Sequence, residues 1–136
     1  MRPAARLRPS DGLRFLAIAL LLGEGIIHLQ QYEGVLHAVP TINALFLINF
    51  VSAALIALAF AGSRDQGAIA WALIAIAITV VALGSLAVAR ASSLFSYSEP
   101  TLRAAVVVAM ALELGAILAA SGFIVARSFE LARRPR

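Results

Sequence analysis

Two ionisable residues inside a long apolar run have the types and spacing that could do chemistry. Glu24 and His28 are four residues apart within LRFLAIALLLGEGIIHL, and Gln31 follows one turn later, so a helix places all three on one face. Glu113 lies in another apolar run, with no basic residue within one helical turn. Because an ionised carboxylate facing lipid is costly, we expect both glutamates to face the interior of a helix bundle.

The other apolar runs contribute uncharged polar side chains at similar depths, among them Asn49 and Thr79. These groups gather in the middle and toward one common side of the expected helices, whereas the opposite halves are almost purely apolar. We therefore predict an outward-facing polar cavity whose ligand-binding or proton-relay residues are Glu24, His28, Asn49 and Glu113. A structural interpretation stays open, in which Glu24 and His28 form a hydrogen-bonded pair and the asparagines hold helices together.

Metal binding has only weak candidates. Glu24, His28 and His37 carry oxygen and nitrogen donors, but Glu-x3-His on a helix is a weak signal. A transmembrane b-type haem needs two histidines on opposing helices, and His37 falls in the adjoining loop. The sequence has no phosphate-binding loop, Ser-His-Asp set or His-Glu-x-x-His motif, so it identifies no catalytic residue or cofactor, and nothing beyond the carboxylates supports an enzyme.

Composition places the chain in a membrane. Of its 136 residues, 62% are hydrophobic and 13% charged, whereas soluble domains are about 45–50% apolar and about 25% charged. The absence of cysteine excludes disulfides and thiol chemistry. The net charge of +4 comes entirely from arginine, and we interpret it as a topology signal with anionic lipid as the partner rather than nucleic acid.

Four apolar runs predict an all-α, single-domain integral membrane protein, an antiparallel up-down bundle of four transmembrane helices. The expected helices are about 13–29, 41–61, 68–89 and 102–126, with Pro40 and Pro100 near the starts of the second and fourth. If residues 1–12 and 127–136 are cytoplasmic tails, nine of the eleven arginines lie inside. The positive-inside rule therefore favours cytoplasmic termini, which we assign to a bacterial inner membrane protein.

Two resemblances arise at these residues. Four short helices with a glutamate in the first resemble the small multidrug resistance transporters, which implies that Glu24 binds protons and cationic drugs in turn. The chain departs from that family because AITVVALGSLAVA lacks the aromatic-Ser-Gly signature of the third helix. The run GEGIIHLQQYEGVLHAVPTINALFLINF is similar to a pattern in uncharacterised small bacterial four-helix membrane proteins, which implies architecture without an activity.

Three functions remain open at this stage. The first is a small multi-pass membrane protein that binds or carries a cationic or protonatable ligand. The second is an accessory or assembly subunit, either in a homo-oligomer or in a larger membrane complex. The third is a membrane enzyme acting on lipid or quinone, for which the sequence offers only the two carboxylates.

Overall fold

Four α-helices account for most of the chain. The computed structural model describes residues 8–34 and 39–133, and its helices are α1 (Pro9–Glu33), α2 (Pro40–Gly62), α3 (Asp65–Ala91) and α4 (Ala104–Ala132). All four are long and apolar enough to cross a membrane, which confirms the all-helical prediction and is compatible with a small multi-pass membrane protein. Large apolar side chains such as Leu58 and Leu118 lie exposed on the surface, as expected for contact with a lipid bilayer.

Proline residues lie at or near three of the helix starts. α1 begins at Pro9 and α2 at Pro40, where the fixed φ and missing N–H of proline suit the first turn. α4 begins at Ala104, close to its predicted start at about residue 102, so Pro100 lies shortly before the helix and outside its first turn. The chain around Pro100 is instead held in a loop, where the Glu99 amide donates to the Ala89 carbonyl at the end of α3.

Each helix packs against two neighbours. α1 and α3 each contact both α2 and α4, and α1 makes the more extensive of these contacts. Small residues allow α1 to approach α2, since a Cβ added at Gly25 would lie 3.2 Å from the Cβ of Ala53. Phe60 and Phe123 pack edge to face with ring centroids 5.0 Å apart, within the apolar core.

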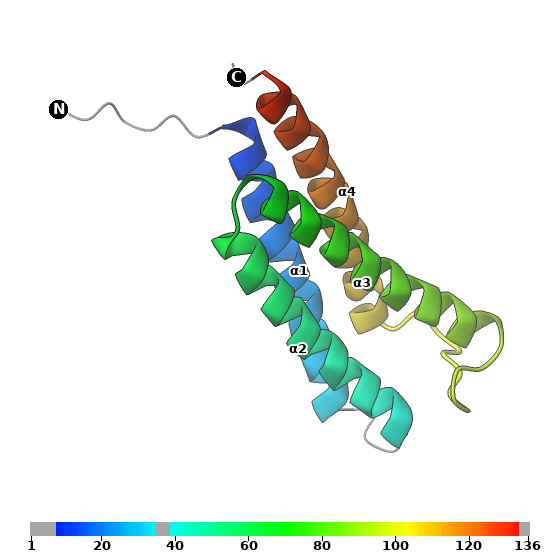
Figure 1. Cartoon of the computed structure of the whole chain (residues 1–136). Helices are drawn as coiled ribbons and strands as arrows, with labels where there is room; N and C mark the ends of the chain where they lie inside the picture. Colours follow the sequence, from blue (N-terminus) through cyan, green and yellow to red (C-terminus); the bar gives the residue numbers. More distant parts are fainter. Residues whose placement is uncertain (1–7, 35–38, 134–136) are drawn as a thin grey trace.

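Polar contacts close one end of the molecule, which we call the terminal end. Figure 1 shows the start of α1 (blue) and the end of α4 (red) there, and the Ser10 hydroxyl donates to Glu130 at 2.8 Å. Arg14 donates to the backbone carbonyls of Phe60, Ala61 and Ser63, which satisfies acceptors left free where α2 ends. Arg127 forms an ion pair with Asp65 at the start of α3, at 2.7 Å.

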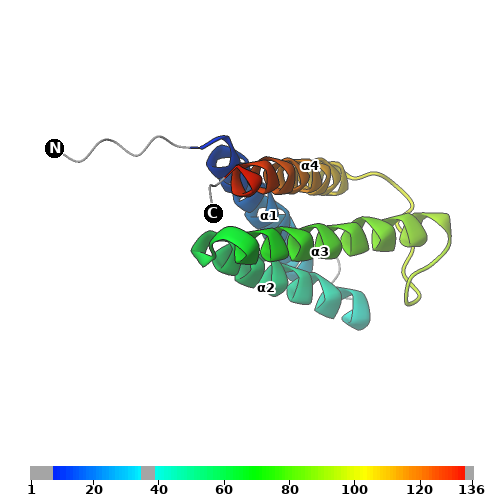
Figure 2. The same ribbon diagram turned by 45° about the horizontal axis from the view of Figure 1, so that its top comes forward.

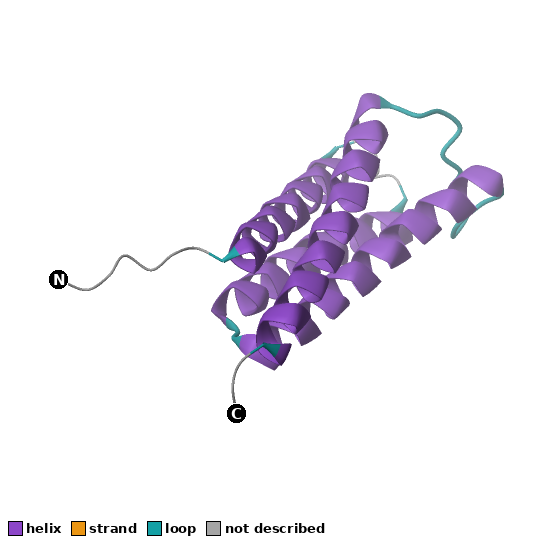
Figure 3. Cartoon of the chain, turned by 90° about the horizontal axis from the view of Figure 1, so that it is seen from above, coloured by secondary structure: helices purple, strands orange, loops and turns teal. Residues whose placement is uncertain are grey.

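At the opposite end, which we call the loop end, a longer connection joins α3 to α4. Figures 1 and 2 both show this connection (yellow) far from the start of α1 and the end of α4, and Figure 3 shows it spanning the separated ends of α3 and α4. Within it, Leu94 and Tyr97 exchange backbone hydrogen bonds of 2.8 and 2.9 Å around a two-residue turn. Phe95 and Ser96 occupy that turn with φ of 49° and 66°, left-handed values that tight hairpin turns require.

Candidate binding cavity

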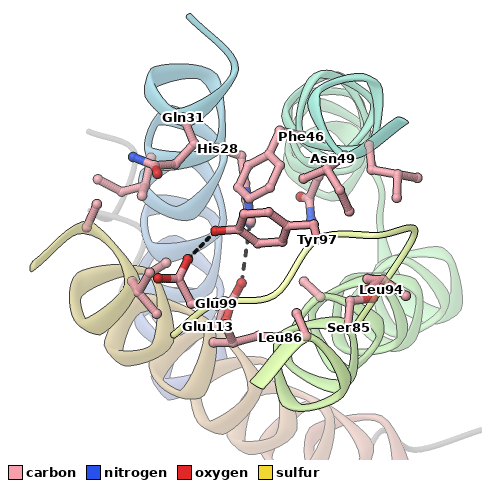
Figure 4. A pocket seen from close by; sticks show the side chains of 18 of the residues that line it. His28, Gln31, Phe46, Asn49, Ser85, Leu86, Leu94, Tyr97, Glu99 and Glu113 are labelled. Carbon is pink, nitrogen blue, oxygen red and sulfur yellow. Dashed lines mark hydrogen bonds and ion pairs between the residues drawn. The ribbon is translucent and has the colours of Figure 1, made fainter. Parts of the chain in front are cut away.

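A partly enclosed cavity of about 230 Å³ lies at the loop end, between all four helices. Most of its lining is apolar, with Ile27 from α1, Phe46 from α2, Leu86 from α3 and Val106 from α4 among the contributors. The α3–α4 connection adds Leu94, Tyr97 and Glu99. Figure 4 shows the Tyr97 ring lying across the cavity.

A buried polar pair connects α1 with α4 at this cavity. His28 Nε2 lies 3.3 Å from Glu113 Oε1, and the two residues are only 8% and 3% exposed. The imidazole also packs against the Phe46 ring, with centroids 5.0 Å apart. Glu113, which lacks a partner near it in the sequence, therefore finds one 85 residues away, and both members of the pair line the cavity.

Glu24 occupies a different position from the other predicted site residues. It is fully buried, and it is not among the residues that line the cavity. Its carboxyl oxygens lie 3.3 and 3.4 Å from the Thr79 hydroxyl on α3. Glu24 lies one helical turn before His28, and His28 contacts Glu113, so the two glutamates belong to one buried polar region.

Several buried polar atoms in the described part of the chain have no hydrogen-bond partner. Three of them belong to cavity-lining residues: His28 Nδ1, Gln31 Oε1 and Asn49 Oδ1. The fourth is Oδ1 of Asn43, a residue outside the lining. Buried polar groups are nearly always paired in folded proteins, so these atoms mark positions where an ordered water or another hydrogen-bonding group is expected.

A second polar cluster, Tyr97, Glu99 and Arg103, holds the loop over the cavity. Arg103 donates to both oxygens of Glu99, at 3.2 and 2.7 Å, and the Tyr97 hydroxyl donates to the same carboxylate. Burial and the hydrogen bond to Glu99 raise the pKa of Tyr97 to about 12. Burial opposes ionisation of Glu99, but the hydrogen bonds from Arg103 and Tyr97 prevail and lower its pKa below the ordinary value.

Sequence reasoning did not identify this cluster, although one signal was present. Arg103 follows Glu99 by four residues, a spacing that brings opposite charges together on a helix. Here the two charges meet in the loop just before α4, where Arg103 forms an ion pair with Glu99. Arg103 therefore has a structural role besides its place in the distribution of arginines between the two ends of the molecule.

The structure does not test the three weak metal candidates as a set, because one of them lies outside the described residues. Within residues 8–34 and 39–133, no group of three or more His, Cys, Asp or Glu side chains is arranged to hold a metal ion. Glu24 and His28 lie in this part of the chain, whereas His37 lies outside the described residues.

Comparison with protein-family models, curated proteins and solved structures found no match to this chain. A function is therefore argued from the cavity itself.

Proposed function

We propose that the chain is an antiparallel up-down bundle in a bacterial inner membrane, with both termini in the cytoplasm. The contacts of Arg14 and Arg127 support this topology, since they bring the start of α1, the end of α4 and the α2–α3 turn to one end. The predominance of arginine on that side agrees with the positive-inside rule. The cavity would then open toward the external side.

The topology can be tested with single cysteines, because the natural chain has none. Gln66→Cys and Ser93→Cys lie at exposed positions near opposite ends of α3. In intact spheroplasts, a membrane-impermeant maleimide should label Ser93→Cys and should label Gln66→Cys only after permeabilisation. The reverse labelling would overturn the orientation, and equal labelling of both in intact cells would overturn the membrane-spanning arrangement.

We propose further that the cavity binds a small organic cation, a protonated amine with an apolar body. The observation that carries this proposal is a carboxylate, Glu113, set within a mostly apolar cavity and contacted by a single imidazole nitrogen among the described residues. A neutral His28 would donate its Nε2 proton to Glu113 and leave Nδ1 as an acceptor. The site would then keep one negative charge, which a cation neutralises.

The unpaired atoms favour an amine that carries N–H groups over a quaternary ammonium ion. His28 Nδ1, Gln31 Oε1 and Asn49 Oδ1 can each accept a hydrogen bond, and all three residues line the cavity. Two lining residues, Phe46 and Tyr97, add aromatic rings whose π faces attract a cation. The remaining apolar lining would hold the body of the ligand.

Isothermal titration calorimetry of the purified protein in nanodiscs can test this function with a matched pair of probes. 2-Phenylethylammonium carries the charge, and 2-phenylethanol has the same apolar body without it. A hydrogen bond to a charged group contributes about 1.5–3 kcal/mol, so we expect the cation to bind at least about tenfold more tightly. Equal affinities would overturn a cation site and would point to an apolar ligand instead.

A further inference from the structure

The hydroxyl of Thr79 has more hydrogen-bonding neighbours than its one proton can serve. Its oxygen lies 2.9 Å from the backbone carbonyl oxygen of Ala75, one turn earlier in α3. It also lies 3.3 and 3.4 Å from the two carboxyl oxygens of Glu24. A threonine hydroxyl has one proton to donate and two lone pairs to accept with, and back-bonding to the carbonyl four residues earlier is its usual choice in a helix.

If the Thr79 hydroxyl donates its proton to the Ala75 carbonyl, a hydrogen bond between Thr79 and Glu24 requires a proton on the Glu24 carboxyl group. An ionised carboxylate can only accept, so it would meet the hydroxyl lone pairs without a hydrogen between them. A protonated Glu24 would donate to Thr79 and complete the chain Glu24 to Thr79 to Ala75. In this arrangement every contact of the Thr79 hydroxyl is a hydrogen bond.

The groups around Glu24 favour placing a proton there rather than on Glu113. Glu113 on α4 contacts His28, which lies one turn after Glu24 on α1, and two ionised carboxylates in one buried region repel each other. His28, the other titratable group in this region, has its Nε2 atom next to Glu113 rather than Glu24. On α3, the group that contacts Glu24 is the uncharged Thr79, and α2 contains no titratable residue. Glu24 is also fully buried, whereas Glu113 reaches the cavity.

We propose that Glu24 is a resident protonated acid beneath the cavity and that Glu113 alone carries the charge that a ligand neutralises. This inference rests on the proposed cation site and assigns different roles to Glu113, which lines the cavity, and to Glu24, which does not. Glu24 is a positioning residue that joins α1 to α3 through Thr79. With a single negative charge, the site accepts a monocation and disfavours a dication.

Infrared spectroscopy can detect the proton without any ligand. In nanodiscs at pH 7, the wild-type protein should show the carbonyl stretch of a protonated carboxylic acid, with the small shift expected in D2O. Glu24→Gln should remove this band, and the matched variant Glu113→Gln should retain it. Thr79→Val, which preserves shape and removes the hydroxyl, should shift the band, so the assignment does not depend on the folding of Glu24→Gln. Absence of the band in the wild type, or its loss only in Glu113→Gln, would overturn the inference.

Binding of 2-phenylethylammonium separates this inference from the proposed function. Because glutamine can donate and accept as a protonated glutamate does, Glu24→Gln should keep the dissociation constant within about twofold of the wild-type value. A loss of about tenfold or more in Glu24→Gln would show that Glu24 supplies charge to the ligand and would overturn the inference. If the wild type shows the infrared band but binds no cation, the proposed function fails while the proton on Glu24 stands.

Discussion

Replacing Arg103 with glutamine should release the loop that lies across the cavity. Arg103 makes two hydrogen bonds to Glu99, whose side chain is only 4% exposed, so the variant leaves a buried carboxylate without its cation. Hydrogen bonds to charged groups contribute about 1.5–3 kcal/mol, and the 30% exposure of the Arg103 side chain argues for the lower part of that range. We therefore expect the loop to open about 2 kcal/mol more easily.

Hydrogen–deuterium exchange measured by mass spectrometry reports this opening directly. The Glu99 amide donates to the Ala89 carbonyl at 3.0 Å and exchanges when the loop leaves α3. A change of about 2 kcal/mol corresponds to exchange about 30-fold faster in peptides covering residues 92–103. Arg64→Gln removes an exposed arginine near the other end of α3 and is the matched control. Unchanged exchange in Arg103→Gln, or equal acceleration in the control, would refute the assigned role of this cluster.

Three further predictions follow from the same contacts. The pKa of Glu99 is lowered in the folded protein, so its ion pair with Arg103 stabilises the loop fully at pH values above the ordinary glutamate pKa of about 4.3. This stabilisation is lost as the pH falls through the lower pKa of the folded protein. Exchange of the 92–103 peptides, corrected for intrinsic rates, should therefore accelerate only below about pH 4. Arg14→Met removes a donor from carbonyls at the end of α2 and should lower the free energy of unfolding in detergent by about 2 kcal/mol, measured by circular dichroism, and no loss would contradict the capping role. Gly25→Leu should cost about 1–3 kcal/mol in the same assay, because even a single Cβ added there would lie 3.2 Å from the Ala53 Cβ. Unchanged stability would show that α1 and α2 need no such close approach.

Helix periodicity predicted which polar side chains face inward. Glu24 and His28 share a face of α1, and both are buried, as is Glu113 on α4. The cost of a charged group facing lipid was enough to reach this result, because it holds for any packing of the helices. Pairing across helices depends on their rotation and relative height, so the contact between His28 and Glu113 could not be read from the chain.

The loop that lies across the cavity could not be predicted from the sequence. Phe95 and Ser96 adopt positive φ without the glycine or asparagine that usually marks such a turn. The position of Tyr97 over the cavity depends on this turn and on the contacts of Glu99, including its amide bond to the end of α3. Pro100 belongs to this loop, and α4 begins at Ala104, close to the predicted start at about residue 102.

The most direct test of the proposed cation site is the affinity of Glu113→Gln for 2-phenylethylammonium, measured by calorimetry beside the wild type. Glu33→Gln removes an equal charge from an exposed position at the same end of the molecule and is the matched control. The account predicts a dissociation constant raised at least about tenfold in Glu113→Gln and unchanged in Glu33→Gln. Equal affinity in all three proteins would contradict the claim that Glu113 holds a cation in this cavity.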